Sequence, residues 1–163
     1  MTVASGIDPI QLRALVIAPV LDYLGLGGAA AEELLLGTAI QESASGRYLH
    51  QLGAGPAVGI DEMEPPTYDD LWANYIPSVP ELAMKLRGLR LGVDLVPPVD
   101  EMAGNLYYAV AMARVLYRRV SAPLPPAGDI GKQAAYYKRW YNTPKGAATE
   151  AEYIAHWRAA TAG

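Results

Sequence analysis

Residues 101–120 read EMAGNLYYAVAMARVLYRRV and show the clearest helical period in the chain. The stretch is nearly all apolar apart from Arg114, Arg118 and Arg119. Its apolar residues recur at a spacing that places them on one stripe of an α-helix. We therefore expect the central, most buried helix here, with a stripe formed by Met102, Leu106, Ala109, Ala113 and Leu116 or Tyr117.

Two helices are predicted before this stretch. The Asp-Pro pair at residues 8–9 is typical of a helix start, and an apolar pattern then continues to the glycine-rich residues 25–28. Pro19 lies inside this pattern and is expected to kink or divide it. Residues 29–43 are rich in Ala, Leu and Glu, which favour helix. We expect this second helix to end near Glu42.

Glycines and prolines dominate residues 44–66, so we expect turns or a short hairpin and no long helix there. Thr67 is a candidate N-cap for a helix over residues 67–76, with acidic residues in its first turn. The expected fold class is mainly α, with an irregular loop or short hairpin after the helix that ends near Glu42. Further helices are predicted at residues 81–91, 130–141 and 149–160.

Composition is typical of one globular domain over residues 1–163. Hydrophobic residues make up 52% and charged residues 18%, which is enough for a core and too little charge for disorder. The net charge is −4 and no run of like charges occurs, so we expect no nucleic-acid partner. Uncharged stretches such as residues 14–21 are too short to cross a membrane, so we expect no membrane insertion.

The chain offers few groups for metal or thiol chemistry. It has no cysteine and only two histidines, His50 and His156. Thiolate zinc sites and cysteine nucleophiles are therefore excluded, and we expect no metal and no cofactor. The N-terminal residues lack the basic region and apolar core of a signal peptide. We expect another delivery route if the target lies outside the cytoplasm.

Glu42 is the first candidate for chemistry. A glutamate at the end of an apolar helix, next to an irregular segment, is expected to lie half in the core and half over a cleft. Partial burial raises the pKa of a carboxyl group, which lets a glutamate act as a general acid near neutral pH. The structural alternative is that Glu42 caps its helix or pairs with Arg47.

Four short motifs follow one another between residues 35 and 142. Residues 37–43, GTAIQES, end in Glu-Ser, and residues 59–67 read GIDEMEPPT. Asn105 then precedes LYYAVAMARVLY, and residues 134–137 read AAYY. In this order the motifs resemble those of the lysozyme-like lytic transglycosylases, in particular a group of small proteins encoded by tailed bacteriophages.

This resemblance implies a helical lysozyme-like fold with a sugar-binding cleft. It implies that Glu42 protonates the glycosidic oxygen and then, as a base, helps the muramic acid 6-hydroxyl to close to an anhydro sugar. Tyr136 is the second catalytic residue that we assign on the family match. The residues assigned to substrate binding are Ser43, Gly59, Ile60, Glu62, Met63, Asn105, Tyr107, Tyr141 and Asn142.

Two positions depart from the family pattern. Glu62 stands where the family has a glutamine, and Tyr137 stands where it usually has an asparagine. Each substitution is compatible with altered chemistry or with a cleft that no longer catalyses.

The acidic residues Asp61, Glu62 and Glu64 leave a hydrolase open. One of them would be a second carboxylate, about 5 to 5.5 Å from the first in retaining enzymes and about 6.5 to 9.5 Å in inverting ones. For Asp61 and Glu64 we favour a solvated turn that caps the helix starting near Thr67.

Tyrosine is unusually frequent, with eleven residues and no phenylalanine. Because a buried tyrosine must find a partner for its hydroxyl, this choice calls for an explanation. The tyrosines either line a carbohydrate cleft or belong to an amphipathic core and a protein interface. The residues concerned are Tyr107, Tyr108, Tyr136, Tyr137 and Tyr141.

Three functions remain open from the sequence. The first is a peptidoglycan-degrading lytic transglycosylase or muramidase, carried in a phage virion and acting on glycan strands in the bacterial periplasm or cell wall. The second is a structural virion protein of the tail or internal core, with little or no activity and with other virion proteins as partners. The third is a module that binds glycan without cutting it.

Overall fold

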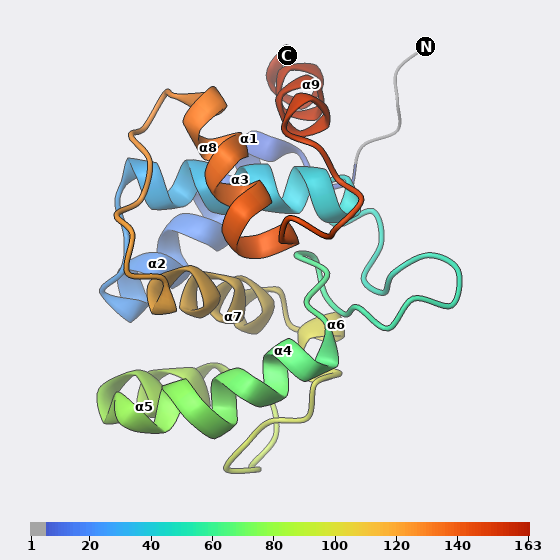
Figure 1. Cartoon of the computed structure of the whole chain (residues 1–163). Helices are drawn as coiled ribbons and strands as arrows, with labels where there is room; N and C mark the ends of the chain where they lie inside the picture. The colour runs from blue at the N-terminus through green and yellow to red at the C-terminus, as the bar shows by residue number, and fades with distance from the viewer. Residues whose placement is uncertain (1–5) are drawn as a thin grey trace.

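Helix α7 (Leu106–Arg119) lies in the middle of the fold, as its apolar period predicts (Figure 1). The computed structural model describes residues 6–163. Every residue from 108 to 117 is buried, including Arg114. Neighbouring helices therefore enclose α7 on all sides, and the prediction of a central buried helix is confirmed.

Asn105 divides the helix predicted over residues 101–120. The helix α6 (Glu101–Gly104) ends before Asn105, which has an extended backbone (φ −124°, ψ 95°), and α7 begins after it. The Asn105 side chain accepts a hydrogen bond from the backbone N–H of Tyr108 at 3.1 Å. The prediction of one continuous helix is wrong, because an asparagine side chain that caps a helix start competes with helical pairing of the backbone.

Helix α3 (Ala29–Ser43) packs against α7 and confirms the second predicted helix. Residues 34–40 are all buried, so this helix passes through the core. The chain leaves α3 one residue after Glu42, through Ala44 and Ser45, whose φ angles of 51° and 58° are left-handed. Glu42 therefore stands where the core meets the following loop.

The N-terminal segments are α1 (Pro9–Leu12), a π-helical turn over residues 13–17 and α2 (Ala18–Leu24), which follow one another directly. Asp8 caps α1 with its side chain, as predicted. The π-helical turn immediately precedes α2, which contains Pro19. A proline has no N–H to donate to the preceding turn, so the wider turn accommodates it where a kink was expected.

The helix predicted to start at Thr67 starts two residues earlier, as α4 (Pro65–Asp70). Glu64 is the extended residue before it, and a proline in the first helical position has its φ angle already set for a helix. Thr67 is therefore not the N-cap, which corrects the prediction. A π-helical and a 3₁₀ turn over residues 71–78 lead into α5 (Pro80–Leu89), which confirms the next predicted helix.

The C-terminal part contains α8 (Ile130–Tyr137), a π-helical turn over residues 138–142 and α9 (Glu150–Thr161). Both helices were predicted close to these bounds. Thr149 and Glu152 form a reciprocal capping box at the start of α9. The helices α8 and α9 pack on α3, and so they hold the residues between them beside the end of α3 (Figure 1).

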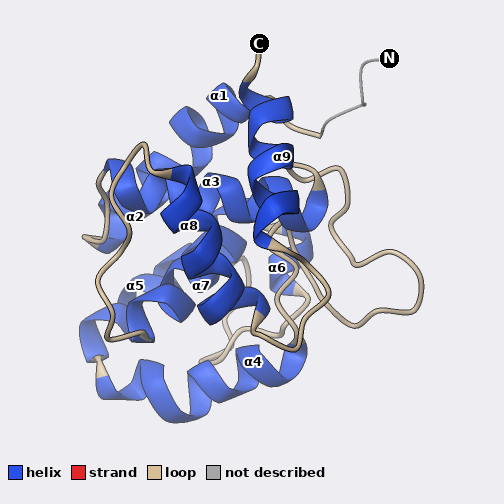
Figure 2. Ribbon diagram, turned by 45° about the horizontal axis from the view of Figure 1, so that its top comes forward, coloured by secondary structure: helices blue, strands red, loops and turns tan. Residues whose placement is uncertain are grey.

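Residues 6–163 contain no strand, which confirms the mainly helical class (Figure 2). The loop after α3 forms two isolated antiparallel bridges, one between His50 and Val58 and one between Val58 and Met63. The expected short hairpin is thus reduced to single bridges. No helix in the described part of the chain is long and apolar enough to span a membrane.

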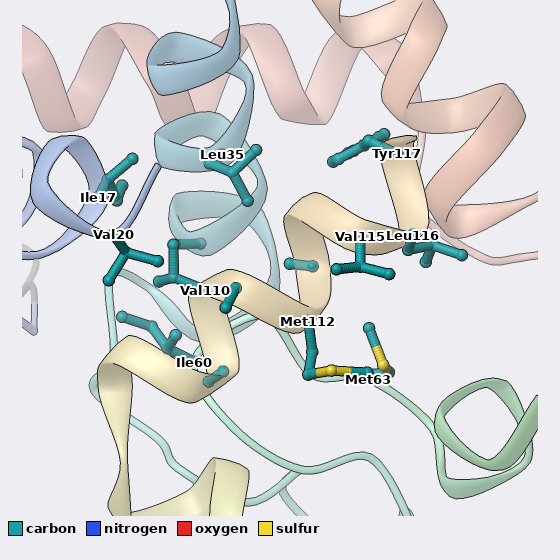
Figure 3. Packing of buried hydrophobic residues seen from close by; sticks show 14 of the residues in the cluster. Ile17, Val20, Leu35, Ile60, Met63, Val110, Met112, Val115, Leu116 and Tyr117 are labelled. Carbon is teal, nitrogen blue, oxygen red and sulfur yellow. The ribbon is translucent and has the colours of Figure 1, made fainter. Parts of the chain in front are cut away.

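The core surrounds α7 and extends to the loop after α3. Figure 3 shows Ile17, Val20 and Leu35 from the N-terminal half near side chains of α7. Ile60 and Met63 reach the same cluster from the loop, and both are almost fully buried. The loop is therefore anchored in the core beside Glu42.

Three of the buried tyrosines, Tyr68, Tyr108 and Tyr117, have hydrogen-bond partners for their hydroxyls inside this core. The hydroxyls of Tyr68 and Tyr108 lie 2.6 Å apart, and Trp72 Nε1 donates to Tyr108 at 3.0 Å. The hydroxyl of Tyr117 lies 2.8 Å from Thr38 Oγ1. For Tyr108 the structure therefore supports the core explanation rather than the carbohydrate cleft.

Candidate active site

A pocket of about 610 Å³ opens beside the C-terminal end of α3. Its lining comes from that helix end, from residues 51–67, from Leu116 of α7 and from residues 141–148 after α8. Glu42, Glu62 and Glu64 all contribute to it. The pocket joins segments that are distant in the sequence around the residue expected to be catalytic.

Burial is the main cause of an unusual pKa at Glu42, which rises from 4.5 to about 7. The Tyr137 hydroxyl donates a hydrogen bond to Glu42 Oε1 at 2.5 Å, and this bond lowers the pKa because it stabilises the carboxylate. The charges of Glu62 and Glu64 raise it. Near neutral pH the carboxyl group is therefore divided between its acid and base forms, as general acid–base catalysis requires.

Asp61 lies beneath the pocket rather than in it. Its side chain is 2% exposed, and neither carboxylate oxygen has a hydrogen-bond partner within residues 6–163. Burial, together with the charge of Glu42, raises the pKa of Asp61 well above its usual value. Our interpretation of Asp61 as part of a solvated turn is wrong, because the Ile60–Met63 loop is anchored in the core.

Glu62 and Glu64 lie on either side of Met63, and all three line the pocket. Burial raises the pKa of Glu62, while the charge of His50 lowers it. Glu64 is exposed and makes no side-chain cap at the start of α4. The capping role expected for Glu64 is therefore not seen.

Ser43, Gly59 and Ile60 hold the loop in place. The buried Ser43 hydroxyl lies 2.5 Å from the carbonyl oxygen of Ile60 and accepts from the backbone N–H of Gly46 at 2.8 Å. Ile60 is fully buried, and Gly59 has a left-handed φ of 87°. These residues were assigned to substrate binding, and the structure places them under the pocket, as its supports.

The tyrosine that contacts Glu42 is Tyr137, one residue after the expected Tyr136. The Tyr136 hydroxyl donates to the carbonyl oxygen of Ala122 at 2.9 Å, and its side chain is 8% exposed. Successive residues on a helix point about 100° apart, so only one of the two faces Glu42. In the sequence Tyr137 was one of five tyrosines considered for a carbohydrate cleft and a departure from the family pattern, but it was not assigned to the site.

Asn105 and Tyr107 lie away from the pocket. Asn105 caps α7, and its Nδ2 donates to the carbonyl oxygen of Leu89 at 2.8 Å. Tyr107 is 47% exposed, and its hydroxyl lies 3.3 Å from the carbonyl oxygen of Leu15 on the N-terminal segment. The structure therefore does not bring either residue together with Glu42.

Tyr141 and Asn142 do line the pocket, as predicted. The Tyr141 hydroxyl donates to the backbone carbonyl of Asp61 at 2.7 Å, which ties the end of α8 to the loop after α3. Asn142 Oδ1 accepts from Lys138 Nζ at 2.8 Å. Sequence reasoning did not assign other lining residues: Gln41 lies in the motif at residues 37–43 but was given no role, and no motif marks Gln51 or Lys145.

Other hollows carry less chemistry. One hollow, of about 890 Å³, lies between the start of α8 and the end of α9, and its ionisable lining residues are Asp129 and Arg158. Asp129 is occupied as the cap of α8. A hollow of about 240 Å³ between α2 and α5 contains Glu81 paired with Lys85. Among these three hollows, the pocket at Glu42 contains a group whose pKa is near neutral, and we therefore take it as the candidate active site.

Residues 6–163 contain no group of three or more His, Cys, Asp or Glu side chains arranged to hold a metal ion. The chain matches no protein-family model, no curated protein and no solved structure.

Replacing Tyr137 by phenylalanine is expected to raise the pKa of Glu42 above about 7. The lost hydrogen bond stabilises the carboxylate, so the acid form becomes favoured. We expect a rise on the order of one unit, measured by ¹³C NMR titration of the Glu42 carboxyl. Tyr136→Phe is the control and should leave this titration unchanged. An equal rise of the Glu42 pKa in the control would show that the hydrogen bond from Tyr137 does not specifically lower that pKa.

The free energy of unfolding is expected to fall as the pH rises from about 5 to about 8. Folded Glu42, with a pKa of about 7, keeps a proton that the unfolded chain, near 4.5, releases. Its contribution is complete below the lower value and is lost as the pH passes the upper one. With about 1.4 kcal/mol per unit, the loss is on the order of 1–3 kcal/mol. Urea unfolding of wild type and Glu42→Gln measures it. Parallel pH curves would contradict the raised pKa.

Proposed function

We propose that the chain cleaves the glycan strands of bacterial peptidoglycan, as a lytic transglycosylase or muramidase with Glu42 as its acid. The observation that carries the proposal is a carboxyl group with a pKa of about 7 that lines a pocket of about 610 Å³. The Glu-Ser motif at the end of a buried helix adds the resemblance to lysozyme-like enzymes. The finer lysozyme-like assignment of the helical fold is part of the same proposal.

In this mechanism Glu42 donates its proton to the oxygen that links two sugars. Because Tyr137 donates to Oε1, the proton is carried on Oε2. In a transglycosylase the resulting carboxylate then removes the proton of the muramic acid 6-hydroxyl, which attacks the sugar. In a muramidase the attacking group is water. Tyr137 is a positioning residue that fixes the carboxyl plane.

The pocket lining suits a polar, amide-rich glycan. Gln41, Gln51 and Asn142 offer amide donors and acceptors beside Glu42. Lys145 lies in the same lining and provides a cation for a carboxylate of the muramic acid lactyl group or its peptide. We propose delivery in a phage particle, with action at the cell wall.

The test separates binding from cleavage. Purified peptidoglycan sacculi are incubated with wild type or Glu42→Gln, and bound protein and soluble glycan are both measured. We expect both proteins to sediment with the sacculi and only the wild type to release glycan. If both proteins bound equally and neither released glycan, the chain would be a glycan-binding module and the proposal of an enzyme would be wrong.

A structural virion role is the second candidate, and an exposed apolar segment favours it. Leu91, Val93 and Leu95 are 80%, 87% and 72% exposed. The segment is braced, because Arg87 Nε donates to the carbonyl oxygen of Leu95 at 2.7 Å. For this role we expect Leu95→Asp to block incorporation into particles, whereas Glu42→Gln would not.

A further inference from the structure

Glu62 is a further carboxyl group in the pocket lining, and it has no role when Glu42 acts as the proton donor. It shares the pocket lining with Glu42 but comes from a separate segment, the loop between α3 and α4. Within residues 6–163 no hydrogen bond joins the two carboxyl groups. Both carboxyl groups therefore line one pocket without a hydrogen bond between them.

The neighbouring acids are less suited to act with Glu42. Asp61 is almost fully buried, so its carboxyl group is closed to substrate, and burial raises its pKa. Glu64 is exposed, and its charge affects Glu42 less than that of Glu62 does. Of the two acids that line the pocket with Glu42, Glu62 therefore affects the pKa of Glu42 more strongly.

The backbone holds Glu62 in a rare conformation. Its φ of 45° lies in the left-handed region, which few residues other than glycine adopt. The turn is nevertheless fixed, because Val58 and Met63 exchange backbone hydrogen bonds of 2.9 and 3.1 Å around it. The Tyr141 hydroxyl also binds the carbonyl oxygen of Asp61. Strained residues in well-supported turns concentrate at functional sites.

We propose that Glu62 is the general base that activates water, so that the chain hydrolyses the glycan and leaves a reducing sugar end. The inference rests on the proposed function of Glu42. The bond from the sugar C1 to the bridging oxygen breaks as that oxygen takes the Glu42 proton. A water oxygen bonds to C1 as the Glu62 carboxylate takes one water proton. Release of that proton to solvent and protonation of Glu42 from solvent restore both groups.

Partial burial also fits Glu62 for this role. Burial raises its pKa, and a carboxylate becomes a stronger base as its pKa rises. The proposal assigns the chain to the inverting class of glycosidases, whose carboxyl groups stand about 6.5 to 9.5 Å apart with a water between one of them and the sugar.

The experiment digests purified peptidoglycan in ¹⁸O-labelled water and examines the products by mass spectrometry. Wild type should give reducing ends that carry one ¹⁸O atom. Glu62→Gln should lower the rate of this product by about 100-fold or more, the range for loss of a general base. Glu81→Gln, a change of the same kind at an exposed glutamate outside this pocket, should stay within threefold of wild type.

A second variant separates catalysis from folding. Asparagine tolerates a left-handed backbone better than glutamate does, so Glu62→Asn should fold at least as stably as wild type. It should still lose labelled reducing ends as Glu62→Gln does.

The remaining outcomes distinguish failure of the proposed role of Glu62 from failure of the proposed function. Anhydro products alone from wild type, absent with Glu42→Gln, would overturn the role of Glu62 and leave the proposed function standing. Hydrolysis at the wild-type rate by both Glu62 variants would do the same. No product from folded wild type would overturn both.

Discussion

Glu42→Gln is expected to slow cleavage of peptidoglycan by about two to four orders of magnitude. The glutamine keeps the size of the side chain and still accepts the hydrogen bond from Tyr137. It has no proton to give to the bridging oxygen at any pH. The loss therefore falls on the chemical step, while binding to the glycan should be retained.

The rate of dye release from labelled sacculi measures this effect. Glu64→Gln is the matched control, because Glu64 lines the same pocket but is exposed. We expect the control to keep its activity within threefold. If both variants lost activity equally, a general change in pocket charge would explain the result better than a proton donor at Glu42.

Gly59→Ala is expected to destabilise the fold by about 2–5 kcal/mol. Gly59 has a φ of 87°, and a left-handed alanine costs about 1–2 kcal/mol. An added Cβ would also lie 3.0 Å from the carbonyl oxygen of Met102 and 3.3 Å from Cβ of Ala109. The backbone at Gly59 therefore lies too close to Met102 and Ala109 to carry a side chain. In the alanine variant the loop that carries Glu62 must move away from them.

Gly53→Ala in the same loop separates the two costs. Gly53 also has a left-handed φ, of 74°, but an added Cβ would meet no atom within 4 Å. It should lose only the conformational part, about 1–2 kcal/mol. Urea unfolding compares the two variants. An equal loss in both would show that the close approach at Gly59 has no energetic effect.

Local patterns were enough to predict most helices. The apolar periods of α3 and α7 are long, and the caps at Asp8 and Thr149 act through neighbouring residues. The breaks were harder to predict, because Asn105 can extend a helix or cap one. Whether Asn105 caps α7 or extends a helix depends on contacts with Leu89 and Glu101, which both accept hydrogen bonds from its Nδ2.

The candidate site was predictable in part. The position of Glu42 at a helix end beside a breaker-rich segment already predicted partial burial, and the structure agrees. The contact of Tyr137 with Glu42 was not predicted, because the face of α8 that meets Glu42 depends on how that helix packs on α3. Asp61 was misplaced for a similar reason, since the anchoring of its loop by Ile60 and Met63 is a tertiary effect.

Mass spectrometry of the glycan ends left in purified peptidoglycan tests the central claim most directly. Folded wild type should create new ends at muramic acid C1, either reducing or anhydro, and Glu42→Gln should create none. New ends from both proteins, or none from folded wild type, would contradict Glu42 as the acid of a peptidoglycan-cleaving site.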